Sequence, residues 1–152
     1  MSGGYHSVLD LAKYIVNKCI DNNMPISNFK LQKMLYLTQL AMLKQVRWVA
    51  FYENIEAWKW GPVVPYAYYA MCSNGALPII IPYKLEEKPS GFVKRVIDNV
   101  IAEKIALDPF QLQEEIEVEG SPWVKVYNNG KGINKVIPLS MMKDFVKLQK
   151  DG

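Results

Sequence analysis

The side chains that most often perform acid–base or metal chemistry are scarce in this sequence. The chain has a single histidine, His6, close to its N-terminus. This excludes histidine-based acid–base pairs and histidine-rich zinc sites. Phosphate-binding loops are missing too, because Gly3-Gly4 precede no strand–helix unit and no G-x-x-x-x-G-K-[ST] motif occurs. We therefore predict no catalytic residue, no metal ligand and no cofactor.

One cluster of acidic side chains needs separate consideration. Four of the six residues from 114 to 119 are glutamates, namely Glu114, Glu115, Glu117 and Glu119. Neighbours one or two positions apart point to different faces of a helix, so these carboxylates do not converge. We expect a solvent-exposed face here.

Lysine can perform chemistry when it is buried, but no pattern in the sequence selects one lysine for that role. Lys30 and Lys33 stand out because they are i, i+3 neighbours at the start of a predicted helix. Either both are solvated while Leu31 packs, or they meet an acidic partner surface or a nucleic-acid backbone. Residues 24–52 contain no Asp or Glu. The net charge of +3 is too small to indicate nucleic acid or a membrane.

Aromatic side chains gather in residues 55–66, which also hold a Gly-Pro pair. Trp58 and Trp60 would share one face of a strand. Gly61 and Pro62 predict a rigid corner after them. The tryptophans either belong to the core or form a partly exposed platform with Tyr66, Tyr68 and Tyr69 of the next segment. Trp and Tyr dominate the energetics of protein interfaces.

The elements that would position these residues are mostly helices. Ser7 and Asp10 predict the start of an amphipathic helix that ends at residues 21–25. Ser27 or Asn28 caps a second helix to about Lys44. Its apolar residues, which include Leu31, Leu35 and Leu40, surround more than half of it, so it should be central. Gln32 within it should hydrogen-bond to backbone.

The remaining segments predict short elements. We expect a strand over 51–60, a helix over 64–72, and an edge strand or extended linker over 77–82. Ser90 caps a further helix, and Asp108-Pro109 with Gln111 predicts a capping box. Residues 124–137 should form a hairpin or loose loop, and Pro138 and Ser140 start a last helix. Trp123 should fill the core.

Together these elements predict an α+β fold that is predominantly α-helical. We expect one domain over residues 1–152, with its core at about 7–148, made of five to six helices and a small antiparallel β element. Cys19 and Cys72 lie in apolar patterns without a C-x-x-C motif, so both should be buried thiols in a reducing compartment. Without a basic and apolar leader or a membrane-length apolar stretch, we expect a cytoplasmic protein.

Several motifs, in order along the chain, resemble the Panacea domain family, which contains SocA-like, prophage-associated antitoxins. The first two are P-I-S-N-F-K-L-Q-K-M-L-Y from residue 25 and I-E-A-W-K-W-G-P-V-V-P from residue 55. The weaker ones are E-G-S-P-W at 119–123 and I-P-L at 137–139. Two features depart from the family pattern: Trp60 replaces a more usual tyrosine, and the segment after Trp123 is shorter and less basic.

The resemblance implies a non-enzymatic protein–protein interaction module that neutralises a cognate toxin by binding it. It implies these partner-binding residues: Lys30, Lys33, Tyr36, Trp58, Trp60, Gly61, Pro62 and Tyr66. It implies these structural residues: Gln32, Val64 and Trp123. A protease or a second copy of the chain are further candidate partners, and neutralisation through delivery to a protease stays open.

A nucleic-acid-binding transcriptional regulator is the alternative function, and an enzyme is the least favoured one. The regulator would use the acid-free residues 24–52. Phosphate contacts would give its affinity a steep salt dependence, which an interface centred on aromatic side chains would not show.

Overall fold

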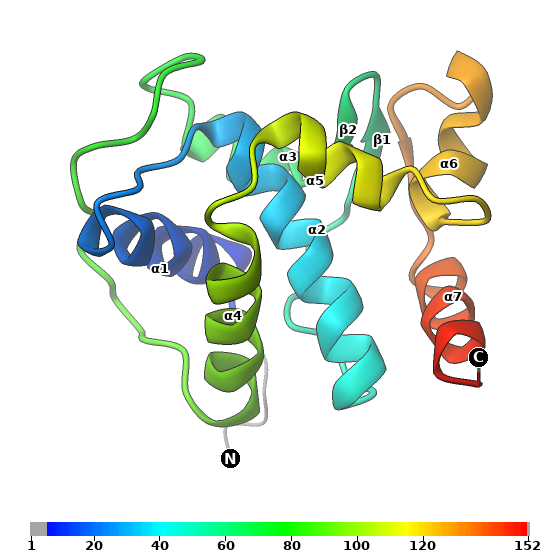
Figure 1. Cartoon of the computed structure of the whole chain (residues 1–152), viewed down its shortest axis with the longest axis horizontal. Coiled ribbons are helices and arrows are strands. Elements are labelled where there is room, and N and C mark those ends of the chain that lie inside the picture. The colour runs from blue at the N-terminus through cyan, green and yellow to red at the C-terminus, as the bar shows by residue number, and fades with distance from the viewer. Residues whose placement is uncertain (1–5, 152) are drawn as a thin grey trace.

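The computed structural model describes residues 6–151, with side chains as far as Gln149 (Figure 1). Its described residues form an α+β fold in which helices predominate, as predicted. The helices are α1 (Val8–Asp21), α2 (Asn28–Gln45), α3 (Pro65–Ala70), α4 (Gly91–Lys104), α5 (Pro109–Ile116), α6 (Pro122–Tyr127) and α7 (Leu139–Asp151). The strands are β1 (Glu56–Trp58), β2 (Gly61–Val63) and β3 (Lys135–Val136), and a 3-10 turn, η1, covers Asn128–Gly130.

Helix α2 is central, as its apolar surface predicts. It packs against α1, α4, α5, α7 and β2, and Figure 1 shows it between the α1–α4 pair and α7. Leu31 and Leu35 are fully buried in a core cluster that includes residues from α1 to α7. Leu40 is only half-buried, against expectation, because it faces a hollow between α2 and α7.

The helix starts agree with their capping residues. Ser7 accepts a hydrogen bond from Leu9 N, and Ser27 accepts one from Lys30 N. Asp108 and Gln111 form the predicted capping box at α5. Ser90 is the N-cap of α4, although its side chain accepts no capping bond. These caps satisfy N–H groups that a helix cannot pair within itself.

The strand predicted over 51–60 is much shorter than expected. Only Glu56–Trp58 is a strand, because Gln39 of α2 binds the backbone before it: Gln39 Nε2 donates to Phe51 O, and Ala50 N donates to Gln39 Oε1. The sheet is antiparallel, with the order β2–β1–β3. The predicted corner at Gly61-Pro62 is also wrong, since both residues belong to β2.

Two further predictions fail. Residues 122–127 form helix α6 rather than one arm of a hairpin, because Ser121 accepts from Val124 N and Pro122 suits the first turn. Asn128 and Asn129 then end that helix in the left-handed region, and β3 pairs with β1. Cys19 is buried as predicted, but Cys72 is exposed just beyond α3, where Met71 faces the core.

No helix among the described residues is long and apolar enough to cross a membrane.

Candidate functional site

Six aromatic residues belong to the start of α2, to the β1–β2 hairpin and to α3, which follows the hairpin in the chain. Figure 1 shows the hairpin at the end of the molecule where α2 begins. Four of them are exposed by 39–67% of their surface: Phe29, Trp60, Tyr66 and Tyr69. Trp58 and Tyr68 are half-buried between them. We call these six residues the hairpin patch.

The rings of the hairpin patch support one another. The Trp58 and Tyr68 ring centroids lie 5.0 Å apart in an edge-to-face arrangement, and those of Tyr68 and Tyr69 lie 5.3 Å apart at 84°. Trp58 Nε1 donates to Glu56 Oε1 at 2.9 Å. Tyr66 and Tyr69 are i, i+3 neighbours, so they share a face of α3. Three of the six rings, those of Trp58, Tyr68 and Tyr69, are therefore in mutual contact, and the other three lie on α2, at the hairpin turn and on α3.

A hollow of about 240 Å³ opens within this patch. Phe29 and Gln32 of α2, the hairpin, Tyr68, and Ile133 with Asn134 form its walls. Lys59 is the one charged residue among them, and its ammonium lies 4.9 Å from the centre of the Trp60 ring. Such a hollow is suited to an apolar side chain of another molecule and provides little for catalysis.

Buried polar side chains along α2 hold the hairpin and α3 in place. Asn28 Nδ2 donates to Tyr68 O at 2.9 Å. Gln32 Nε2 donates to Asn28 Oδ1, and Gln32 Oε1 accepts from Val64 N at 2.9 Å. The predicted hydrogen bond of Gln32 to backbone is thus confirmed. Asn28, Gln32 and Gln39 follow one another at intervals of about one and two helical turns, so they lie on one side of α2. The motif around residues 28–39 therefore positions residues 50–68.

Lys33 is the charged member of this set. Its side chain is 1% exposed, and its Nζ donates to Trp60 O and to Gln113 Oε1, both at 2.5 Å. Burial lowers the pKa of the ammonium to about 8, although the negative charge of Glu117 acts in the opposite direction. A buried cation therefore lies directly beneath the tip of the hairpin.

Lys30 is buried as well, at 8% exposure, but it serves another part of the fold. Its Nζ donates to Ile105 O, at the end of α4. Burial also lowers its pKa. Of the two alternatives for these lysines, the one in which both are solvated is wrong, because each reaches a backbone carbonyl inside the protein.

Tyr36 and Trp123 connect α2 to the far side of the sheet. Trp123 is buried, as predicted, and its ring stacks on Tyr127 with centroids 4.7 Å apart. Trp123 Nε1 donates to Trp58 O at 3.1 Å, and Trp123 N donates to Tyr36 Oη at 3.3 Å. Burial raises the pKa of the Tyr36 phenol. Both residues therefore support β1 from within.

The eight residues suggested for partner binding thus fall into two groups. Trp60 and Tyr66 are exposed and Trp58 is half-buried, all in the hairpin patch. The buried ones are Lys30, Lys33, Tyr36, Gly61 and Pro62. Sequence reasoning missed Phe29, Ile133 and Gln113. A large apolar ring at the second position of α2, outside the apolar stripe, could have signalled Phe29; nothing in the sequence signals the other two.

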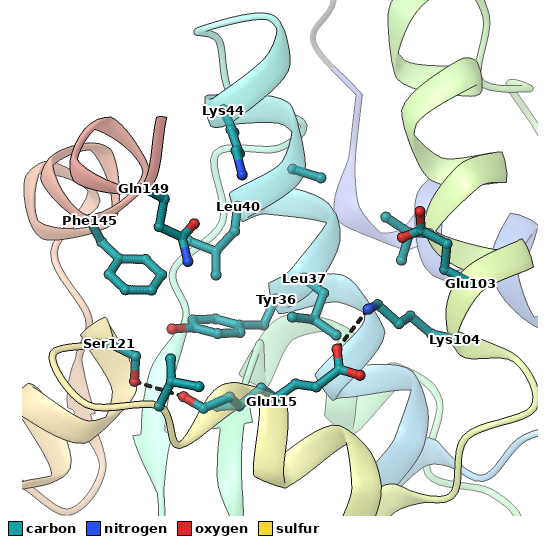
Figure 2. Close-up of a pocket in the computed structure, with 14 residues that line it drawn as sticks. Tyr36, Leu37, Leu40, Lys44, Glu103, Lys104, Glu115, Ser121, Phe145 and Gln149 are labelled. Carbon is teal, nitrogen blue, oxygen red and sulfur yellow. Dashed lines mark hydrogen bonds and ion pairs between the residues drawn. The ribbon is translucent and has the colours of Figure 1, made fainter. Parts of the chain in front are cut away.

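A second hollow, of about 250 Å³, lies between α2, α4, α5 and α7. We call it the helix groove. Figure 2 shows Tyr36 and Leu37 within it, Phe145 and Gln149 on the α7 side, and the Lys104–Glu115 ion pair on the other. That ion pair is 2.6 Å long. Glu115 faces Lys104 and is still 42% exposed, so all four glutamates, Glu114, Glu115, Glu117 and Glu119, are solvent-exposed as expected.

Across residues 6–149, no group of three or more His, Cys, Asp or Glu side chains lies close enough together to hold a metal ion. The most developed surface feature is the aromatic hairpin patch, and fold and patch together define a helical protein with an interface-like surface.

A comparison with curated proteins finds a relative of this class. The chain is 28% identical to Antitoxin SocA of Caulobacter vibrioides (strain NA1000 / CB15N), over 155 aligned residues. The alignment covers 92% of this chain and 82% of that protein, and it supports a SocA-like antitoxin family. No family model matches the chain, and no solved structure matches it.

Proposed function

We propose that this protein is an antitoxin that neutralises a partner toxin by binding it directly. The observation that carries the proposal is its similarity to Antitoxin SocA, which extends over 92% of the chain. The order of motifs that resembles the Panacea domain family supports the same function. On that resemblance, the proposal includes a prophage-associated toxin–antitoxin pair, a cytoplasmic location and no enzymatic activity.

The hairpin patch is the surface that we propose for toxin binding. Trp and Tyr side chains at the centre of an interface contribute most to affinity, because they bury large areas with little loss of conformational freedom. Trp60, Tyr66 and Tyr69 are each more than half exposed in the free protein. Side chains of α2 hold the backbone of Trp60, and of Val64 and Tyr68 at either end of the segment that carries Tyr66, which lowers the entropic cost of binding.

This proposal divides the suggested residues by role. Trp58, Trp60 and Tyr66 would contact the toxin, and the buried Lys33, Tyr36, Gly61 and Pro62 would maintain the surface behind them. Gln32, Val64 and Trp123 belong to the same supporting structure, since Gln32 binds Val64 N and Trp123 binds Trp58 O. Lys30 would instead stabilise the end of α4, where it donates to Ile105 O. Charge reversal at Lys30 and Lys33 would then act through folding rather than through a surface contact.

Co-expression with the toxin encoded beside the gene tests the proposal. The wild-type protein should rescue growth and co-purify with the toxin. Trp60→Ala and Tyr66→Ala should each weaken binding by roughly 2 kcal/mol, or about 30-fold, with unchanged circular dichroism. Phe92→Ala is the matched control: Phe92 is 61% exposed, in the first turn of α4, and Figure 1 shows that end of α4 far from the hairpin.

Three outcomes would count against the proposal. If no neighbouring gene is toxic and the protein binds DNA with a steep salt dependence, it is a regulator instead. If the purified pair does not associate but rescue requires a cellular protease, neutralisation works through delivery to that protease. If Trp60→Ala, Tyr66→Ala and Phe92→Ala all rescue like wild type, binding uses another surface.

A further inference from the structure

Lys33 is a buried cation without an acidic partner. In the described part of the chain it forms no ion pair, and the groups that it contacts are neutral. A buried charge that lacks a counter-ion is costly, and it persists only where other groups replace its hydration. Removing such a cation should therefore change the structure around it. The groups that contact Lys33 then indicate which part of the fold depends on its charge.

Three groups replace the water around the Lys33 ammonium. Two are the oxygens Trp60 O and Gln113 Oε1, each 2.5 Å from Nζ. The third is the ring of Phe29, whose centre lies 4.3 Å from Nζ. Phe29 and Trp60 are both members of the hairpin patch. One ammonium thus joins α2, the hairpin tip and α5 at a single point.

The surrounding residues are consistent with a fixed position for this cation. Gly61 follows Trp60 and has a φ of +137°, and any Cβ there would collide with Lys33 Nζ and Gln113 Oε1. The orientation of the Gln113 amide leaves its Nε2 buried without a partner. A buried unpaired donor is costly. This orientation follows from Lys33, because the reverse one would place an NH₂ group against an ammonium.

We infer that Lys33 is a positioning residue for the hairpin patch: its charged ammonium holds Trp60 and Phe29 in the arrangement that a partner binds. The inference rests on the proposed function for the partner's identity, but the effect on the hairpin does not depend on it. Lys33 does not touch the partner. It acts through the hydrogen bond that its ammonium donates to Trp60 O. Because the donor is charged, this bond is stronger than a bond between neutral groups.

Lys30 provides an internal comparison. It is also buried, lies three residues earlier in the same helix, and donates to a backbone carbonyl at 2.5 Å. Its acceptor is Ile105 O, which ends α4 and lies outside the hairpin patch. Removing either charge should alter the contacts that its ammonium makes, but only removal of the Lys33 charge should change the hairpin.

The charge of Lys33 can also be removed by pH. The elements packed around it carry several charged groups, among them Lys59 of the hairpin, Lys30 of α2 itself and the glutamates of α5. The one that acts on the pKa of Lys33 is Glu117, at the C-terminal end of α5. Glu117 favours the charged form, and burial disfavours it more strongly, which brings the pKa to about 8. The hairpin should therefore loosen as pH rises through about 8.

Fluorine NMR of protein labelled with 5-fluorotryptophan tests the inference without any partner. The chain has four tryptophans, and Trp60→Phe assigns the resonance of Trp60. In the wild type this resonance should shift or broaden as pH rises through about 8. In Lys33→Met it should already have moved at neutral pH and should no longer titrate. Lys30→Met, the matched control, should leave the resonance and its titration as in the wild type.

Gln113→Glu separates positioning from simple packing. A carboxylate at this place would pair with the ammonium, so the Trp60 resonance should keep its wild-type position and titrate at higher pH. An unmoved resonance in Lys33→Met, or an equal change in Lys30→Met, would overturn the inference. So would a pH profile that is the same in the wild type and Lys33→Met.

Toxin binding is the second measurement. Loss of one charge-assisted contact should weaken the affinity of Lys33→Met about ten- to a hundredfold, and Gln113→Glu should bind at pH 8.5 better than the wild type does. If Lys33→Met moves Trp60 but the wild type binds no toxin, the proposed function fails and the positioning role stands. If Lys33→Met moves Trp60 and still binds at full affinity, the patch is not the surface that the toxin contacts, and the inference fails in that part.

Discussion

Two hollows of nearly equal volume, about 240 and 250 Å³, lie along successive stretches of α2 and differ in chemistry. The hairpin hollow has aromatic walls, one lysine and no acidic residue. The helix groove contains four charged residues: Lys44, Glu103, Lys104 and Glu115. Interface centres are poor in charge and rich in aromatic residues. The two hollows therefore cannot be distinguished by volume, and only the hairpin hollow has the wall chemistry that is typical of an interface centre.

The two hollows also differ in how their walls are held. Behind the hairpin, side chains of α2 hydrogen-bond to the backbone of Trp60 at the turn and of Val64 just after β2. The strands of this small sheet are only two or three residues long, so they depend on such outside contacts. In the helix groove the walls are helices whose backbones are paired internally, so a change of side chain there should alter the surface without moving the backbone. The predictions below test this difference.

The largest expected effect on stability comes from a change in α2, the helix that both hollows share. Leu35 is fully buried in α2, between the stretches that line them. Leu35→Ala should lower the free energy of unfolding by about 2–5 kcal/mol through the lost contacts and the cavity left behind. Both regions should then unfold together in a thermal melt that is followed by far-ultraviolet circular dichroism and by tryptophan fluorescence. A melting temperature equal to that of the wild type would show that α2 is not the common support.

Gly61→Ala should damage the hairpin alone. An alanine at a φ of +137° is strained by roughly 1–3 kcal/mol, and its Cβ would also displace the Lys33 ammonium from Trp60 O. Toxin binding should weaken while the far-ultraviolet circular dichroism stays helical.

Gly75→Ala is the control for Gly61→Ala. Gly75 also has a positive φ, +58°, but its Cβ would meet no atom within 4 Å. It should cost about 1 kcal/mol in a urea melt and leave toxin binding unchanged. Equal loss of binding in both variants would mean that general destabilisation, not the hairpin, sets affinity.

The sequence predicts the helices and buried residues that support the two hollows better than it predicts the exposed surfaces around them. Local signals sufficed for α1, α2, α5 and the buried Trp123, because caps and apolar periodicity depend only on neighbouring residues. The predicted hairpin or loop over 124–137 is wrong for 124–127, where β-like composition hides the Ser121-Pro122 helix start, whereas 135–136 do form a strand.

Burial of the lysines could not be foreseen for a different reason. Whether Lys33 is solvated depends on Trp60 and Gln113, which are 27 and 80 residues away in the chain. No local pattern contains that information. The motif from residue 25 indicated that Lys30 and Lys33 matter, but only the fold shows that one supports α4 and the other supports the hairpin.

The pH dependence of stability should show the buried charge directly. Lys33 has a pKa of about 8 when folded and an ordinary value of 10.5. Between these values the unfolded chain holds the proton that the folded chain has lost, so stability should rise with pH. Above pH 9 the Cys19 thiol acts oppositely, because burial raises its pKa to about 11. From pH 8 to 9 the wild type should gain up to about 1.4 kcal/mol relative to Lys33→Met. Parallel urea-melt profiles for the two proteins would refute a buried ammonium.

The smallest effect should come from the helix groove. Lys104→Met and Glu115→Gln each break an ion pair 2.6 Å long whose side chains are 20% and 42% exposed. A partly exposed pair of this kind contributes about 0.2–1 kcal/mol, so urea melts should change little, and a double-mutant cycle should give a coupling energy in the same range. Toxin rescue should be as in the wild type, because the groove walls lie outside the proposed interface.

Charge reversal with Glu115→Lys is the more demanding variant, since a partner seated in the groove would then meet two adjacent cations. If a folded Glu115→Lys protein fails to rescue growth while Trp60→Ala still rescues it, the toxin binds the charged helix groove and not the hairpin patch.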